Sequence, residues 1–400
     1  MLSLFTFIFV IISSLVWPGI WQEEWSHLPY VMLTGAALIF FATLFIHLLI
    51  LSPLANIQQN FFPAVMSYVQ RDWAIYLRWL FLFVFVLVSC AGVVWMADWP
   101  LPWIFPAWLV YFALSLDVVH NSTLYLIRFL DPTQLIEQLV KQAKKGILSQ
   151  KDLLFWNALD NLSEAGLRGV ERSQLALGTQ VLQSMPEIMQ LFFTSSRSAG
   201  RKNQDQAIQK ETGKDEVGYT LFYLLQRLEL INDKALHGHL ELLCRQMIVT
   251  MSKLIILCAK FDLSTVSFPT HLLTKFALRA QQRHYDEVSV LATSSLLEIA
   301  KAILVEVDIT YAELQEPFQA IINGLATIAR KTFQKDKSTN LTLLMEPLQQ
   351  LKALFASPKL AEHRDTPKIM QMINNVLDEF HILADVLARL PPIVSPSESS

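Results

Sequence analysis

Five polar side chains interrupt the long apolar stretches of the N-terminal region, where burial in lipid would make each of them costly. Asp117 and Asn121 are four residues apart and His120 lies beside them, so on a helix all three share one side. His47 and Arg78 lie in the two preceding apolar stretches. A charge at the centre of a bilayer costs about 2.5 to 3.5 kcal/mol on insertion scales, so Asp117 needs a cation or water. We expect Arg78 to be that cation.

These polar residues allow two interpretations. In the first, the carboxylate and the imidazoles form a proton or cation pathway past Arg78, because imidazoles titrate near neutral pH. In the second, the same groups hold the helices together, or lie in the headgroup region where the helix leaves the membrane. The sequence alone leaves both interpretations open.

A cluster of cations follows the last apolar stretch. Its members are Arg128, Lys141, Lys144 and Lys145. The three lysines lie in a helical pattern that begins after Asp131 and is expected to end at Gly146. A basic amphipathic helix next to a membrane attracts anionic lipid headgroups, by about 1 kcal/mol per cation. An ordinary solvated helix face has the same composition and is the alternative.

No catalytic motif occurs in the sequence. A glycine-rich phosphate loop, a GxSxG elbow, an HExxH helix and a paired CxxC are all absent, and the chain has only 12 glycines. The nearest approach to a metal site is His237, Glu241 and Cys244, placed at helical spacing, but core and surface positions explain these residues more simply. We therefore expect no enzyme activity, no metal and no cofactor.

The polar residues described above must be positioned by helices that cross a membrane. A helix needs about 20 apolar residues to cross roughly 30 Å of hydrocarbon. The chain has a mean hydropathy of +0.37 and 17% charged residues, and its apolar excess lies before about residue 130. The pattern predicts a bundle of about four transmembrane helices within residues 1–130, at residues 2–17, 30–51, 75–95 and 103–127.

The first stretch, 2–17, resembles the apolar core of a signal peptide in length. No Lys or Arg precedes it and no A-x-A-like cleavage site follows it, so we expect an uncleaved helix. The loops 18–29 and 97–102 also contain no Lys or Arg, whereas Arg71 and the cluster that begins at Arg128 mark the opposite ends of the spans. Because cations are retained on the cytoplasmic side, the N-terminus and the C-terminal part are predicted to be cytoplasmic, in a bacterial inner membrane.

The rest of the chain is predicted to be an all-α cytosolic domain. We expect a juxtamembrane helical segment over 131–193, a flexible linker over 194–217 where the apolar pattern stops, a helical domain over 218–390 and a disordered tail over 391–400. Apolar runs of helix length recur through the third of these segments, as in an α-solenoid or a simple helical bundle.

One self-similarity favours the solenoid. Glu316-Pro317 and Glu346-Pro347 stand thirty residues apart in similar surroundings. Each pair suits the start of a helix, where proline loses no hydrogen bond and a carboxylate meets the positive end of the helix dipole. A period of about thirty residues is typical of a pair of helices in a solenoid.

These expectations lead to two functional hypotheses. The first is a membrane-anchored interaction or scaffold subunit of a multi-protein or homo-oligomeric membrane assembly. The alternative is an ion channel or transporter subunit whose path lies near Asp117, His120 and Arg78. The expected partners are the lipid bilayer, its anionic headgroups and proteins of the same assembly; a net charge of -3 argues against nucleic acid.

Overall fold

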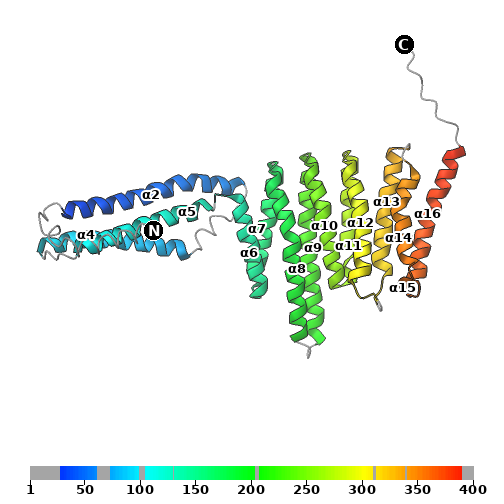
Figure 1. Cartoon of the computed structure of the whole chain (residues 1–400), viewed down its shortest axis with the longest axis horizontal. Coiled ribbons are helices and arrows are strands. Elements are labelled where there is room, and N and C mark those ends of the chain that lie inside the picture. Colours follow the sequence, from blue (N-terminus) through cyan, green and yellow to red (C-terminus); the bar gives the residue numbers. More distant parts are fainter. Residues whose placement is uncertain are drawn as a thin grey trace, which may run out of the picture. The chain divides into compact units, whose positions relative to one another are not determined.

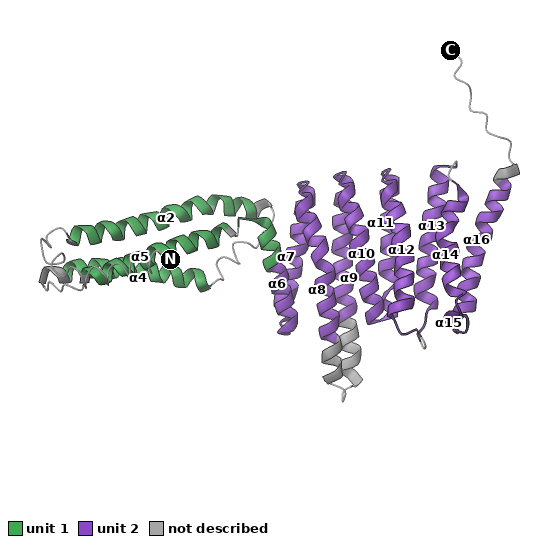
Figure 2. Cartoon of the chain, viewed as in Figure 1, with its two compact units in different colours: residues 1–138 green, residues 139–400 purple. Residues whose placement is uncertain are grey.

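The computed structural model describes residues 28–60, 73–98, 104–128, 130–202, 207–309, 312–337 and 340–389, and every regular element in these ranges is a helix. The expected all-α class is therefore confirmed for the described residues. The helices form two compact units, residues 1–138 and 139–400 (Figure 2). The boundary lies eight residues beyond the expected one at 130/131, because it falls inside α6 (Pro132–Leu148) instead of before that helix.

Unit 1 consists of three long helices that pack against one another in the described part of the chain. They are α2 (Leu28–Asn60), α4 (Trp73–Asp98) and α5 (Ile104–Arg128). They correspond to the expected helices at 30–51, 75–95 and 103–127, whereas the expected helix at 2–17 lies outside the described residues. One difference is that α2 continues through Pro53 to Asn60, nine residues beyond the expected end at residue 51.

Aromatic side chains fill the core of unit 1. Phe85 is completely buried, and its ring lies 5.1 Å from that of Tyr111 and 6.1 Å from that of Trp108, measured between centroids. Gly35 of α2 allows the Trp108 ring to approach, since a Cβ at position 35 would lie 2.7 Å from Trp108 Cη2. Close contact between α2 and α5 thus depends on a residue without a side chain.

Unit 2 is a stack of helices that lie side by side (Figure 1). After α6 it contains α7 (Asp152–Glu171), α8 (Leu175–Lys202), α9 (Ala207–His237), α10 (Glu241–Phe261), η3 (Leu263–Thr265), α11 (Ser267–Gln282), α12 (Asp286–Glu306), α13 (Gln315–Lys335), α14 (Leu341–Phe355), α15 (Pro358–Ala361) and α16 (Thr366–Arg389). From α7 onward, each long helix packs against the next long helix and the one after it. This produces two rows: α7, α9, α11, α13 and α16 form the first row, and α8, α10, α12 and α14 form the second. Packing of near neighbours only is the arrangement of helical repeats.

Two expectations about unit 2 differ from the structure. The expected linker, 194–217, is helical at 194–202 and 207–217, because α8 ends at Lys202 and α9 begins at Ala207. A polar helix lacks the apolar period that marks a packed one, so the sequence pattern suggested a loop. No unit boundary falls there either.

The thirty-residue repeat is not a structural repeat. Pro317 is the third residue of α13, as expected for a helix start, but Pro347 lies inside α14. That helix begins earlier because the Asn340 side chain accepts a 2.9 Å hydrogen bond from the Thr342 backbone N–H. In addition, α13 and α14 belong to different rows, so the two prolines are not in equivalent positions.

A turn that the sequence analysis did not find is repeated instead. Gln150, Ser173, His239 and His284 all have positive φ, between 52° and 65°, and each follows the end of a helix. In each case the next residue donates its backbone N–H to the carbonyl five residues earlier, which is Gly146, Gly169, Ala235 or Ala280. This is a Schellman ending with a small residue at a fixed place. The repeated turn reverses the chain after α6, α7, α9 and α11.

Ion pairs connect neighbouring helices of the first row. The pairs are Asp160–Arg227, Glu171–Lys234, Glu229–Lys275, Asp233–Arg279 and Arg330–Glu379. All are partly exposed, so each contributes about 1 kcal/mol or less to stability. Their main effect is to fix the register of one helix against the next.

Candidate functional site

A small pocket with an arginine in its lining lies at one end of unit 1, where its three helices meet. His47 of α2, Arg78 and Trp79 of α4, and Ser122 and Tyr125 of α5 line it, together with the apolar side chains of Ile75, Leu82 and Leu126. Because α4 runs opposite to α2 and α5, the start of α4 meets the later parts of the other two helices. The closed part of the hollow is about the size of one water molecule.

Arg78 is the charged residue of this pocket. Its guanidinium carbon lies 4.6 Å from the centroid of the Tyr125 ring, a cation–π contact. Its Nη1 atom is buried and has no hydrogen-bond partner among the described residues. A guanidinium stays charged in any protein environment, so the pocket contains a cation whose hydrogen-bonding capacity is only partly used.

The expected pairing of Arg78 with Asp117 is not present. Arg78 contacts Tyr125 instead, and Asp117 lies eight residues before Tyr125 on α5, about 12 Å along the helix axis. Asp117 is half-buried. The sequence pattern suggested the pairing but could not resolve a separation of two helical turns.

His47 is fixed by two contacts. Its Nδ1 lies 2.8 Å from the carbonyl oxygen of Thr43, one turn earlier, and an N–H at that nitrogen donates to it. The imidazole ring lies 4.2 Å from the ring of Trp79, measured between centroids. His47 therefore uses one ring nitrogen to bond its own helix, which leaves Nε2 for another partner.

Ser122 is one of the pocket residues that the sequence did not indicate. It is 9% exposed, and its Oγ is buried without a hydrogen-bond partner among the described residues. Serines in apolar helices commonly bond the carbonyl one turn earlier, as Ser89 and Ser115 do here. Only its position three residues before Tyr125 could have indicated a role.

The other predicted site residues lie elsewhere. His120 and Asn121 are exposed and do not line the pocket. In the basic cluster, Lys144 forms a 2.9 Å ion pair with Glu187 of α8, while Lys141 and Lys145 are exposed. Arg128 is the last residue of α5. The pocket thus gathers only His47 and Arg78 from the expected intramembrane set.

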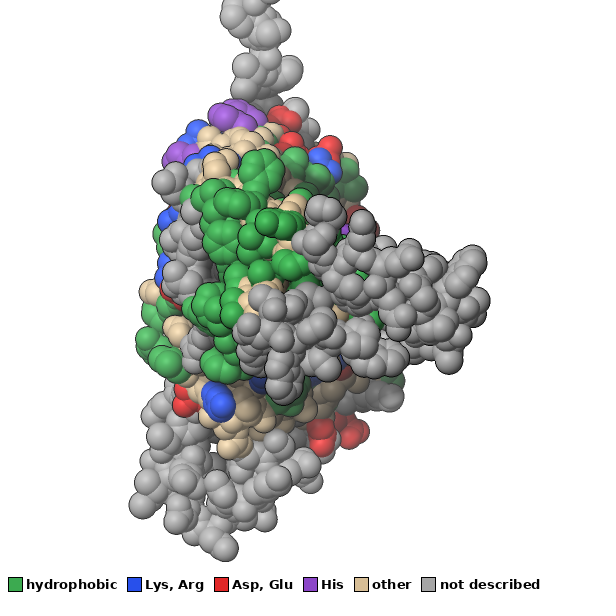
Figure 3. Space-filling view, turned by 90° about the vertical axis from the view of Figure 1, so that its left-hand side faces the viewer, with side chains coloured by type: hydrophobic (Ala, Val, Ile, Leu, Met, Phe, Trp, Pro, Cys, Tyr) green, Lys and Arg blue, Asp and Glu red, His purple; other side chains and the backbone are tan. Residues whose placement is uncertain are grey.

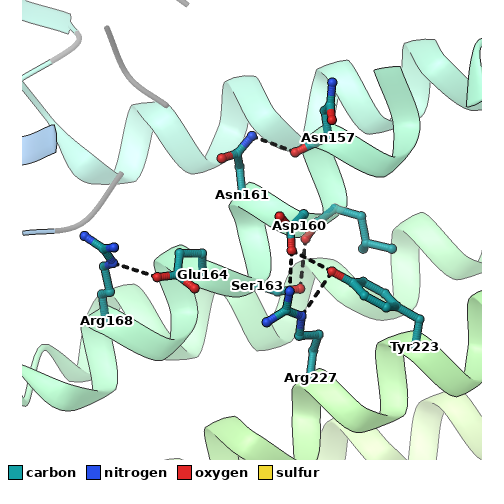
Figure 4. Close-up of polar contacts among 9 residues, drawn as sticks. Asn157, Asp160, Asn161, Ser163, Glu164, Arg168, Tyr223 and Arg227 are labelled. Carbon is teal, nitrogen blue, oxygen red and sulfur yellow. Dashed lines mark hydrogen bonds and ion pairs between the residues drawn. The ribbon is translucent and has the colours of Figure 1, made fainter. Parts of the chain in front are cut away.

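A second polar cluster joins α7 to α9 in unit 2 (Figure 4). The carboxylate of Asp160 accepts hydrogen bonds from Tyr223 Oη at 2.6 Å and from Arg227 Nη2 at 2.5 Å, and Arg227 Nε donates to Tyr223 Oη at 3.0 Å. Burial, followed by the hydrogen bond to Asp160, raises the pKa of the Tyr223 hydroxyl. The three side chains bond one another and thereby connect α7 to α9, which is a structural role.

The possible metal ligands of the sequence do not come together. His237 ends α9 and Glu241 starts α10, with the left-handed residue His239 between them, so they do not share one helix face. Burial, followed by the charge of Glu241, raises the pKa of the Cys244 thiol to about 12. No group of three or more metal-binding side chains occurs in the ranges that the structure describes.

Comparison with known proteins places the chain in no family. No family model matches it, and no curated protein matches it. Among solved structures, it is similar to a "Circular tandem repeat protein with novel repeat topology and enhanced subunit contact surfaces", with 14% identity and a TM-score of 0.43 over 96% of this chain and 90% of that one. A likeness this distant carries no information about activity or partners.

Proposed function

We propose that this protein is a membrane-anchored helical-repeat subunit, in which α2, α4 and α5 cross a bilayer and unit 2 binds other proteins of a membrane assembly. The observation that carries the proposal is the apolar surface of unit 1. Large apolar side chains are exposed on all three of its helices, among them Phe41, Phe45, Trp73, Leu80 and Phe83. Figure 3 shows hydrophobic side chains gathered over a broad area of the face that is turned to the viewer.

The contrast with unit 2 makes this surface informative. In α10 the apolar stretch has a mean hydropathy of 1.7 and 56% of its residues are buried, because neighbouring helices cover it. In α2 the mean hydropathy is 2.3 and only 24% are buried. By length and composition α10 and α12 could also cross a membrane, but their apolar residues have partners in the stack. The exposed apolar residues of unit 1 require a lipid environment instead.

Exposed aromatic residues on the first row support protein binding by unit 2. Tyr219 and Phe222 of α9 are 64% and 46% exposed, and Phe268 of α11 is 49% exposed. The rings of Phe222 and Phe268 lie 5.7 Å apart and those of Trp156 and Tyr219 lie 5.5 Å apart, measured between centroids. Rigid aromatic side chains are enriched in protein interfaces.

The alternative of an ion pathway has less support. His120 and Asn121 do not line the pocket that contains Arg78, and the hollow itself has room for little more than one water molecule. A path would require the polar residues to line one continuous passage.

A spin label tests the anchoring. The chain has three cysteines, of which Cys244 and Cys258 are buried and Cys90, on α4, is exposed, so a nitroxide should attach to Cys90 alone. After reconstitution in vesicles we expect the label at Cys90 to collide more often with oxygen than with a polar nickel complex. A label at Ser294→Cys in a Cys90→Ala background, on exposed α12 surface, should show the reverse. Equal access of the nickel complex at both positions would refute the anchoring.

A photocrosslinker tests the platform. The crosslinking amino acid would replace Phe222 in the full chain, expressed in its membrane, with Gln183 of α8, which is also exposed, as the control position. We expect discrete protein adducts at position 222 and fewer at 183. Absence of any adduct at position 222 would argue against binding through the first row.

A further inference from the structure

The exposed face of α5 carries two polar side chains inside its apolar stretch. His120 and Asn121 are both exposed, and no hydrogen bond joins either side chain to another residue that the structure describes. They lie seven and six residues before Ile127, where the apolar stretch ends, which is about 9 to 11 Å along the helix axis. Polar side chains at such a depth in a bilayer almost always face another helix or water. In a membrane, this face of α5 therefore requires a cover.

The spacing of the residues on this face suits a second helix. Leu114 and Leu124 are 41% and 46% exposed, and with Asp117 and Asn121 they stand at intervals of three, four and three residues. We call these four residues the α5 seam. Its spacing is that of the a and d positions of helices that wrap around each other, and Asn121 falls at an a position. A single Asn at such a position sets the register and the number of paired helices.

The chemistry of the face identifies a second copy of α5 as that helix. Two copies of one chain insert with the same orientation, so a two-fold axis along the membrane normal sets their α5 helices parallel, with Asn121 facing Asn121 of the partner subunit. A side-chain amide has both donors and an acceptor, so two such amides satisfy each other. A helix of another protein would need to carry a matching amide at the same depth.

The same symmetry gives the charged residue of the seam a suitable neighbour. His120 of one copy lies about 4.5 Å along the axis from Asp117 of the other, so an imidazole N–H can approach that carboxylate. Asp117 is also half-buried and already takes part in an interaction within its own chain. The face is thus self-complementary, as a two-fold interface requires.

We propose that two copies of this protein pair through the α5 seam, with Asn121 hydrogen-bonded across the two-fold axis. The pairing rests on the membrane anchoring proposed above, because only in lipid do the exposed His120 and Asn121 require a cover. It gives the assembly two copies of unit 2, so a partner that is itself paired binds with higher avidity than a single one.

Disulfide crosslinking of the full chain in its membrane tests the pairing. A Cys90→Ala background leaves only the buried Cys244 and Cys258, and Leu124→Cys then adds one thiol on the seam. Leu77→Cys on α4 is the matched control, because Leu77 is 56% exposed and also lies a few residues inside the end of its apolar stretch. A disulfide requires two Cα atoms within about 7 Å, so mild oxidation should give about fivefold more dimer at position 124 than at position 77.

Substitution of the amide completes the test. Asn121→Leu in the Leu124→Cys background should lower the dimer yield about threefold, and Asn121→Gln, which keeps the amide, should restore most of it. Circular dichroism should show the same helix content in each variant. Equal yields at positions 77 and 124, or a yield that Asn121→Leu leaves unchanged, would overturn the pairing.

The pairing and the anchoring can fail separately. A chain that stays monomeric while the Cys90 label shows anchoring would overturn the pairing alone, and would assign the cover of α5 to another helix, such as the one expected at 2–17. Access of the nickel complex to the Cys90 label would refute the anchoring, whatever the crosslinking yield.

Discussion

The indole N–H of Trp108 on α5 donates a 2.8 Å hydrogen bond to the hydroxyl of Ser89 on α4, and both residues are buried. Ser89 in turn donates to the carbonyl of Phe85. The Trp108 ring also lies against Gly35 of α2, so one side chain connects all three helices of unit 1.

Ser89→Ala should therefore weaken the association of these helices. It leaves the Trp108 N–H buried without a partner, at a cost of about 0.5 to 2 kcal/mol. Unfolding of the purified protein by a denaturing detergent, followed by circular dichroism, measures the change. Ser115→Ala is the control, because Ser115 is also buried but bonds only its own helix, and it should cost less.

Gly324→Ala should destabilise unit 2. A Cβ at position 324 would lie 2.6 Å from Thr274 Oγ1, where α13 packs against α11, and we expect a cost of about 1 to 3 kcal/mol from overpacking. Gly218→Ala is the opposite case, since the space beside Gly218 is open and alanine is the better helix former. Thermal unfolding of the two variants should shift in opposite directions; a shift in the same direction would contradict the packing described for α11 and α13.

His284→Gly should stabilise the protein. His284 has a φ of 65° in the turn between α11 and α12 and is exposed, so glycine removes steric strain there without removing a core contact. The expected gain is about 0.5 to 1 kcal/mol in the free energy of unfolding. Gln226→Gly, at an exposed position inside α9, should lower stability by a similar amount.

The contact between α13 and α16 should weaken in acid. Arg330 donates two hydrogen bonds to the Glu379 carboxylate, at 2.8 and 2.6 Å, and these bonds lower the pKa of that carboxyl from its ordinary value of 4.5. A carboxyl with a lowered pKa adds stability above its ordinary pKa, and this stability is lost as the pH falls through the lowered value. The hydrogen-exchange protection factors of α16, which are corrected for the intrinsic exchange rate at each pH, should therefore fall below about pH 4.5 in the unchanged protein. With Glu379→Gln the protection factors should be lower at neutral pH and lack this acid dependence; because the pair is exposed, we expect an effect of about 1 kcal/mol or less.

The two buried thiols should be unreactive in the folded protein. Burial raises the pKa of both Cys244 and Cys258 to about 12, so almost no thiolate is present at pH 8. A thiol-reactive chromophore should modify these two cysteines only after denaturant is added. Rapid modification of either one in the native protein would show that α10 opens locally.

Much of the fold could be predicted from the sequence because apolar residues at helical spacing are a strong local signal. The long helices of unit 1 and most helices of unit 2 follow from it. The helical parts of 194–217 could not be found in this way, since polar helices show no apolar period. The sequence suggested that a helix begins at Glu346-Pro347. The N-cap of α14 is instead Asn340, six residues before Glu346, so this helix begins earlier.

The pocket was only partly predictable. The cost of burying charge drew attention to Arg78 and His47, and both of these residues line the pocket. The side chains that contact Arg78 and His47 depend on the axial shift of each helix relative to its neighbour. A hydropathy pattern contains no information about this shift. As a result, Ser122 and Tyr125 take the place that the sequence assigned to Asp117.

The stacking of near neighbours in unit 2 has a mechanical consequence. A pull applied between the two ends of the stack would act on its helix interfaces in series, each of which would yield by a small amount before any one of them broke. The unit should therefore behave as a spring whose stiffness falls as helices are added.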